Sequence, residues 1–193
     1  MATNRAMDVT EGSAPPRHQW PVMPFEAPCR APAEAVYGLL ADLSSHLEWA
    51  GNLQSQTFQL LSMDAPDGPA TVGTEFRTTG ADGKKATWTD RSVVTEAIRP
   101  SVFEFVTEGR RDGRAGREPF RSTTVHRYEI AARPRGSYVT YTAELTRFTG
   151  PRSVVRMARA PVIGTLLWRM AGTYLRKGFD NLLALAEERE GSR

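Results

Sequence analysis

The sequence contains a single cysteine, Cys29, and only three histidines, His18, His46 and His126, among its 193 residues. One cysteine excludes a disulfide framework, and histidines this far apart do not have the spacing of a zinc site. The chain also lacks the GxGxxG, P-loop, GxSxG and HExxH motifs. We therefore expect no metal and no cofactor.

Neither a large charge excess nor a long apolar run is present. The chain has 25 basic and 22 acidic residues, a net charge of +3, which does not predict nucleic acid as a partner. The longest uncharged stretch of the C-terminal region is Ala160–Trp168, far short of the roughly 20 residues that span a membrane. The N-terminus has no apolar core of a signal peptide, so we expect a cytoplasmic protein.

The composition divides the chain into a tail and one folded domain. Residues 1–20 mix Thr, Ser, Pro and Gly with scattered charges, which predicts a disordered N-terminal tail. The length of residues 21–190 fits a single domain. This domain begins with the apolar run Val22–Cys29.

Two short helices are expected after this run. Pro32 suits the start of a helix, and one buried helix face is indicated by the spacing of Val36, Leu39, Leu40 and Leu43. Ser45 and Glu48 have the spacing of a capping box. They predict a second helix that ends near Trp49.

Between residues 53 and 148 the pattern changes to six strands separated by Gly/Pro/Asp breaks. A two-residue turn at Arg99-Pro100 pairs Val94 with Phe105, and a loop at 133–136 pairs Tyr128 with Tyr141. In both hairpins the apolar side chains then share one face, on which we place Trp88, Val94, Ile98, Phe103, Phe105, His126, Tyr128, Ile130, Val139, Tyr141, Ala143 and Leu145. The agreement predicts an antiparallel sheet with one apolar and one solvated face.

The last forty residues return to helical spacing. An apolar stripe is formed by Ile163, Leu167, Met170 and Tyr174 and then by Leu182 and Leu185. Pro161 with Gly164 marks a break between a segment at about 151–160 and a long helix. We expect the stripe to cover the apolar face of the sheet. The fold class is therefore α+β.

This order of elements resembles the START-like SRPBCC superfamily of polyketide cyclase/dehydrase and lipid-binding proteins. The matching segments are APAEAVYGLLADLSSHLEWAG at 31–51, VGTEFR at 72–77, FEF at 103–105, HRYEI at 126–130, GSYVTYTAEL at 136–145 and KGFDNLLALAEE at 177–188. The resemblance implies a helix-grip fold, in which a curved antiparallel sheet of about seven strands surrounds the C-terminal helix and encloses an apolar cavity. It implies a fold and a cavity, and no particular reaction.

Aromatic side chains on the shared face, with three from the helices, either fill a core or line a ligand pocket. The candidate ligand-binding residues are Trp49, Phe76, Trp88, Phe103, Phe105, His126, Tyr128, Tyr141, Trp168 and Tyr174. Apolar walls with a few converging polar groups are typical of a ligand site, so we interpret the set as the wall of a cavity for a hydrophobic or amphipathic small molecule.

The alternative function is that of a polyketide aromatase, cyclase or dehydratase, with His126, Tyr141 and Asp90 as proton-handling groups. The alternation of side chains along its strand places Asp90 on the same face as His126, two strands away, so that their strand axes are roughly 9 to 10 Å apart. Arg77 and Arg91 fall on the outward parity, so no arginine of these strands is predicted to position a substrate.

A second alternative is a membrane-associated lipid carrier. Between Leu145 and Phe179 there are seven basic residues and no acidic one, and basic amphipathic segments bind anionic membranes. Membrane contact is an open alternative that we do not favour, because the apolar stripe is needed against the sheet.

Overall fold

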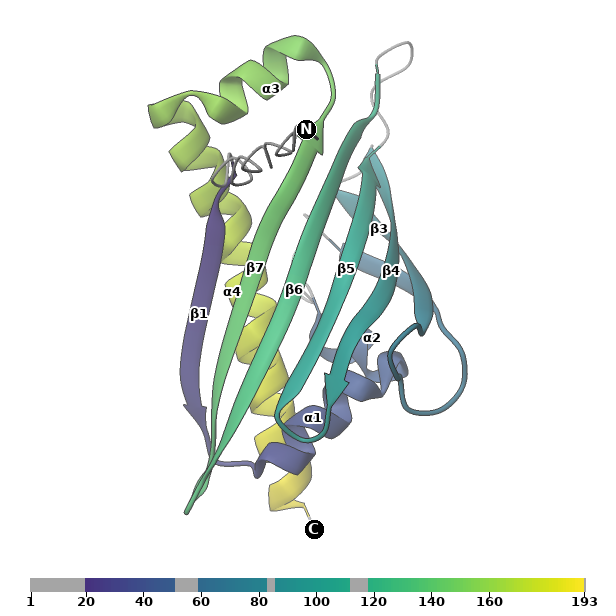
Figure 1. Ribbon diagram of the computed structural model, residues 1–193, viewed down its shortest axis with the longest axis vertical. Helices are drawn as coiled ribbons and strands as arrows, with labels where there is room; N and C mark the ends of the chain where they lie inside the picture. The colour runs from purple at the N-terminus through teal and green to yellow at the C-terminus, as the bar shows by residue number, and fades with distance from the viewer. Residues whose placement is uncertain (1–19, 51–58, 83–85, 112–117, 193) are drawn as a thin grey trace, which may run out of the picture.

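The structure is a computed structural model that describes residues 20–50, 59–82, 86–111 and 118–192. Seven strands form one antiparallel sheet in the order β1-β7-β6-β5-β4-β3-β2 (Figure 1). They are β1 (Val22–Cys29), β2 (Gln59–Asp64), β3 (Glu75–Asp82), β4 (Ala86–Ile98), β5 (Val102–Arg111), β6 (Phe120–Arg133) and β7 (Gly136–Thr149). Residues 1–19 of the predicted tail lie outside the described residues, and Trp20 is buried.

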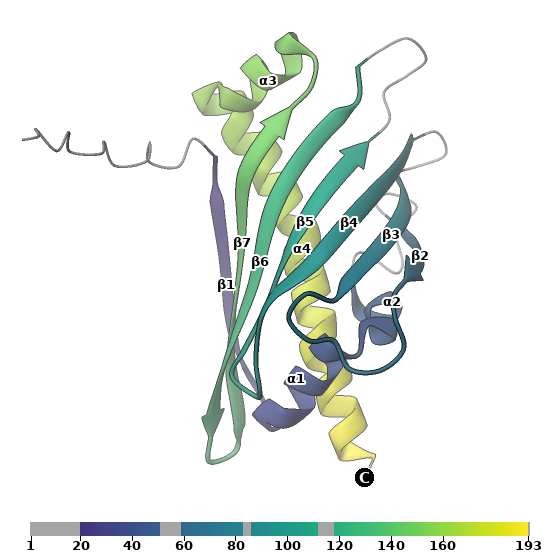
Figure 2. The ribbon, with the colours of Figure 1, turned by 45° about the vertical axis from the view of Figure 1, so that its right-hand side comes forward.

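Helices follow the first and the last strand, as predicted. They are α1 (Ala33–Ala41), the 3₁₀ turn η1 (Leu43–Ser45), α2 (His46–Trp49), α3 (Arg152–Arg159) and α4 (Pro161–Gly191). Helix α4 runs along one face of the sheet, here called the inner face, from the end near α3 to the end near α1 (Figure 2). The α+β helix-grip architecture predicted from the sequence is therefore confirmed.

The two predicted hairpin registers are confirmed, with one correction. Val94 pairs with Phe105, and Tyr128 pairs with Tyr141. A bulge at Thr95 shifts the ladder by one residue, so that Ala97 pairs with Phe103 and Ile98 is exposed. The prediction that Ile98 shares the apolar face was wrong, because one extra residue moves every later side chain to the opposite face.

The predicted capping box is also wrong. Ser45 makes no side-chain cap of α2; its hydroxyl is buried, 2.7 Å from the Leu39 carbonyl oxygen and 2.8 Å from that of Asp42. It also accepts a hydrogen bond from Trp49 Nε1 at 3.2 Å. Ser45 therefore ties α2 to the end of α1, and its polar atoms are satisfied inside the core.

The predicted stripe is correct in the second half of α4, where Leu182 is buried and Leu185 packs against the core, and wrong in the first half. Gly178, Phe179, Leu182, Leu183 and Ala186 are buried, whereas Ile163, Leu167 and Met170 are exposed. Met170 and Phe179 are nine residues apart, which is two and a half turns, so they project from opposite sides of the helix. The contacts of Phe179 and its neighbours with the core fix the rotation of α4.

The junction of α3 and α4 depends on a close approach. Ala160 leaves the helical conformation, and Pro161 occupies the first turn of α4. A Cβ atom on Gly164 would lie 2.3 Å from the carbonyl oxygen of Ala158, so only glycine fits there. Trp168 Nε1 donates to the same oxygen at 3.2 Å, which holds the two helices together.

Candidate functional site

Most of the predicted ligand-binding side chains lie in the core and pack on one another. Seven are buried: Trp49, Phe76, Trp88, Phe103, Phe105, Tyr128 and Tyr141. The ring centroids of Tyr128 and Tyr141 are 4.4 Å apart, and those of Phe105 and His126 are 4.8 Å apart. Trp88 lies apart from the others, since it pairs with Arg111 on the far side of Asp90. The remaining rings close the inner face toward α1, so this part of the predicted wall has the packing of a core.

Trp168 is not brought to this cluster. It is partly buried beside Trp20, Leu145 and Ala158, in a second apolar cluster at the junction of α3 and α4. Tyr174 is also half-buried, on the part of α4 that follows Met170. The set proposed from sequence therefore divides between two places in the fold.

His126 and Tyr141, two of the three predicted proton-handling residues, are in contact. His126 Nδ1 lies 2.8 Å from the Tyr141 hydroxyl, which Tyr128 also hydrogen-bonds. Burial, with a smaller effect of His46, lowers the pKa of His126 to about 4. A neutral imidazole at the end of a tyrosine chain can accept or relay a proton, but it is a weak base.

A second buried histidine, His46, was missed by the sequence analysis. Its Nε2 lies 3.1 Å from the Leu40 carbonyl oxygen, and its ring lies 4.4 Å from that of Trp49. Burial lowers its pKa to about 4. The signal in the sequence was its spacing, three residues beyond Leu43, which continues the apolar face of the first helix.

Asp90 faces inward but is not opposite His126. It pairs with Gly109, which pairs with Ser122, whereas His126 lies in the row of Val94 and Phe105. Four residues of strand separate the two rows, roughly 13 Å. Burial raises the pKa of Asp90 to about 7, because a buried carboxylate loses its hydration.

Gly109 brings Asp90 and Ser122 toward each other. A Cβ atom at position 109 would lie 2.9 Å from Asp90 Oδ1 and 2.8 Å from Ser122 Oγ. The absence of a side chain on the middle strand leaves the hollow that these two polar groups occupy. The row Asp90–Gly109–Ser122 is thus a polar feature of the inner face near its α3 end.

The inner face consequently has two parts. Toward α1 its side chains are buried and aromatic. Toward α3 it carries the buried Trp88 and Leu145 together with polar side chains that are only half-buried. These half-buried residues are Asp90, Thr107, Ser122, Thr124 and His126. Ser92 and Thr107 share a hydrogen bond of 2.9 Å. We call this second part the polar inner surface.

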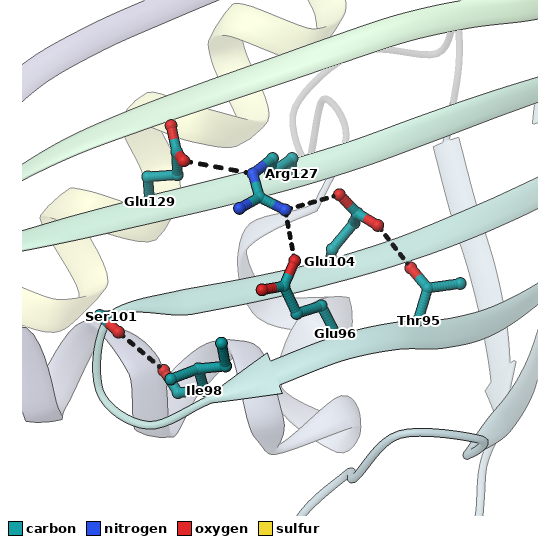
Figure 3. Close-up of polar contacts among 7 residues, drawn as sticks. All are labelled: Thr95, Glu96, Ile98, Ser101, Glu104, Arg127 and Glu129. Atoms are coloured by element: carbon teal, nitrogen blue, oxygen red, sulfur yellow. Dashed lines mark hydrogen bonds and ion pairs between the residues drawn. The ribbon is translucent and has the colours of Figure 1, made fainter.

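The outer face of the sheet carries a compact ion-pair cluster that needs no ligand. Arg127 reaches Glu96 at 2.5 Å, Glu104 at 2.9 Å and Glu129 at 3.2 Å (Figure 3). These bonds raise the pKa of Arg127 further above its usual value. The cluster joins β4, β5 and β6, which gives it a structural role.

Two hollows lie outside the predicted site. A pocket of about 700 Å³ at the α3 end is lined by Glu118, Phe148, Thr149, Gly150, Arg152, Val155, Arg156, Arg159 and Ala160. A groove of about 400 Å³ is lined by Arg77, Thr89, Asp90, Arg91, Glu108, Gly109, Arg110, Arg121, Ser122, Thr123, Arg147 and Thr149. Of the predicted site residues, only Asp90 lines either of them.

Known structures share this architecture. An uncharacterized protein from Rhizobium leguminosarum is 18% identical, with a TM-score of 0.61 and coverage of 88% of this chain and 95% of that one. A conserved protein from Geobacillus kaustophilus is 15% identical, with a TM-score of 0.59 and coverage of 86% of this chain and 94% of that one. Ara h 8.0201 is 12% identical, with a TM-score of 0.54 and coverage of 86% of this chain and 96% of that one. At these identities the likeness concerns the fold alone.

The sequence itself identifies the family. No curated protein matches the chain. The family model described as polyketide cyclase / dehydrase and lipid transport matches residues 26–187, which is nearly the whole described region. The chain therefore belongs to the polyketide cyclase/dehydrase and lipid transport family, of the SRPBCC type that its motifs resemble.

Proposed function

We propose that the protein binds a hydrophobic or amphipathic small molecule on the inner face of its sheet. The observation that carries the proposal is the division of that face. An aromatic cluster closes one part, while the side chains of the polar inner surface beside it are only half-buried. Membership of a family of polyketide cyclases and lipid transport proteins supports the same ligand class.

The arrangement fits an elongated, amphipathic ligand. Its apolar part would lie against the edge of the aromatic cluster, at Phe105 and His126, whose rings stack. Its oxygen atoms would reach Ser122, Thr124 and Asp90. Apolar walls with a few polar groups are typical of small-molecule sites, because the walls supply affinity and the polar groups fix orientation.

Two neighbouring substitutions on β6 test this site. Thr124 lies on the inner face and Val125 on the outer face, and both are half-buried. We expect Thr124→Trp to lower the affinity for Nile red, an uncharged apolar dye, at least tenfold, because the indole would fill the polar inner surface. Val125→Trp adds the same group on the other face and should change the affinity less than twofold.

Fluorescence titration measures both affinities, after thermal melts have established that each variant folds cooperatively. A wild-type protein that takes up no Nile red would contradict the proposal. Equal losses in the two variants would also contradict it, because they would place the dye elsewhere.

The second candidate function is cyclisation or dehydration of a polyketide-like chain. The observation that favours it is the pKa of Asp90, which burial raises to about 7. General acids and bases work best with a pKa near the operating pH. In this second function Asp90 transfers the proton, while His126, oriented by its hydrogen bond with Tyr141, holds the substrate oxygen.

A further inference from the structure

Large apolar side chains are exposed over a short part of the chain. Of the eleven that are exposed among the described residues, six lie between positions 157 and 170; they are Met157, Val162, Ile163, Leu166, Leu167 and Met170. Val162 is 82% exposed and Leu166 61%. We call this the α3–α4 surface. Contiguous exposed apolar side chains mark an interaction site, because their contact with water is unfavourable unless another surface covers them.

The same surface is basic. No acidic residue occurs between Leu145 and Phe179, and Arg152, Arg156 and Arg169 are exposed. Arg159 lies over the ring of Trp20, 5.0 Å from its centroid. Apolar and cationic side chains are therefore combined without acidic residues between them, which is the composition of helices that lie in the surface of an anionic bilayer.

The pocket of about 700 Å³ opens beside this surface. Phe148, Val155 and Ala160 give it apolar walls, and Arg152, Arg156 and Arg159 line it with positive charge. Glu118 is the one acidic residue among the described residues of the lining, so the three arginines leave the net charge around the pocket positive. An anionic headgroup fits this combination better than a neutral one, since arginine binds phosphate oxygens through paired N–H groups.

We propose that α3 and the first half of α4 dock on the surface of an anionic lipid bilayer. Val162, Leu166 and their apolar neighbours enter the interface between headgroups and acyl chains, while the arginines meet lipid phosphates. No helix in the described part of the chain is long and apolar enough to cross a membrane. The helices would therefore lie in the plane of the bilayer.

The charges favour a bilayer over a second copy of the chain. In a two-fold dimer the same patch meets itself, which would place two sets of arginines against each other without acidic partners from this segment. The surface is separate from the polar inner surface, so docking does not depend on the proposed ligand. Failure of one proposal leaves the other intact.

Vesicle sedimentation tests the docking. The full chain should sediment with vesicles of equal parts phosphatidylglycerol and phosphatidylcholine, and not with phosphatidylcholine alone. Binding should fall sharply between 0.1 and 1 M salt, as the Debye length shortens from about 10 Å to 3 Å. The variant Arg152→Gln/Arg156→Gln/Arg169→Gln should bind about 100-fold more weakly, at about 1 kcal/mol per charge.

A matched variant controls for net charge. Arg77→Gln/Arg133→Gln/Arg135→Gln removes three exposed arginines from β3 and the β6–β7 turn, and its binding should stay within threefold of the wild type. Val162→Gln/Leu166→Gln, which changes only exposed side chains, should weaken binding at least tenfold. Thermal melts of all three variants should match the wild type.

Four results would overturn the proposal. The first is no sedimentation with the anionic vesicles, and the second is equal sedimentation with both vesicle types. The third is an equal loss of binding in the two arginine variants, which would make net charge the cause. The fourth is a concentration-dependent dimer that Val162→Gln/Leu166→Gln dissociates, because the surface would then be covered by a second copy of the chain.

Discussion

The burial of His46 predicts a specific loss of stability in acid. The side chain is 3% exposed and its pKa is lowered to about 4, against about 6.5 in an unfolded chain. Between these values the unfolded state binds a proton that the folded state does not. The free energy of unfolding therefore falls as the pH falls from 6.5 toward 4.

The linkage relation gives the magnitude. From pH 7 to pH 4.5, a pKa difference of this size lowers the free energy of unfolding by about 2.5 kcal/mol, since each pKa unit is worth about 1.36 kcal/mol. His126 acts in the same direction. Asp90 acts in the opposite direction, because its raised pKa contributes stability below pH 3.8 that is lost as the pH rises through 7.

Because these effects overlap in the wild type, the test compares it with His46→Gln. The amide can still donate to the Leu40 carbonyl but does not titrate near neutral pH. We expect the difference in unfolding free energy between the two proteins to shrink by about 2.5 kcal/mol from pH 7 to pH 4.5. Urea denaturation followed by tryptophan fluorescence measures it, and a difference that does not vary with pH would refute the reasoning.

Two further predictions concern α4 and Asp90. Gly164→Ala should destabilise the protein by about 1 to 3 kcal/mol, because its Cβ would meet the Ala158 carbonyl oxygen. Gly38→Ala in α1 has nothing within 4 Å of the new Cβ and should stabilise the protein by about 0.5 to 1 kcal/mol. Thermal melts check both values, and a melting temperature for Gly164→Ala that is not below that of the wild type would contradict the first. If the protein cyclises a poly-β-keto thioester, Asp90→Asn should reduce turnover about 100- to 10,000-fold with little change in substrate affinity, and an unchanged rate would exclude Asp90 as the proton-transfer group.

The strand pairing could be predicted because strands have a period of two and the turns limit the choice of register. Tyr128–Tyr141 and Val94–Phe105 follow from that rule. The bulge at Thr95 could not be predicted, since no glycine or proline marks it and the turn at Arg99 is one residue longer than assumed. Beyond Val94 the local sequence allowed either a ladder without a bulge, with Glu96 opposite Phe103, or a ladder with one. The structure has the bulge, which places Ala97 opposite Phe103.

The candidate site was predicted in part for the same reason. The strand alternation places His126 and Tyr141 on one face. Because Tyr141 pairs with Tyr128, it is a diagonal neighbour of His126, and their side chains are 2.8 Å apart. The position of Asp90 along its strand was not fixed by parity, which gives the face and not the row. Only the pairing of Asp90 with Gly109, and of Gly109 with Ser122, shows that Asp90 lies four residues along the sheet from the row of His126.

Helix α4 shows why an apolar stripe does not by itself identify the buried side of a helix. Over its 31 residues, about 46 Å, the first half presents Ile163, Leu167 and Met170 on one side, and the second half buries Phe179 and Leu182 on another. A straight helix can turn only one side toward the sheet, and the contact of Phe179 with the core decides which. The remaining apolar side chains contribute little to folding, because they stay in water in the folded state. The proposed docking on an anionic bilayer would explain their presence beside exposed arginines, because the acyl chains would receive the apolar side chains and the lipid phosphates the arginines.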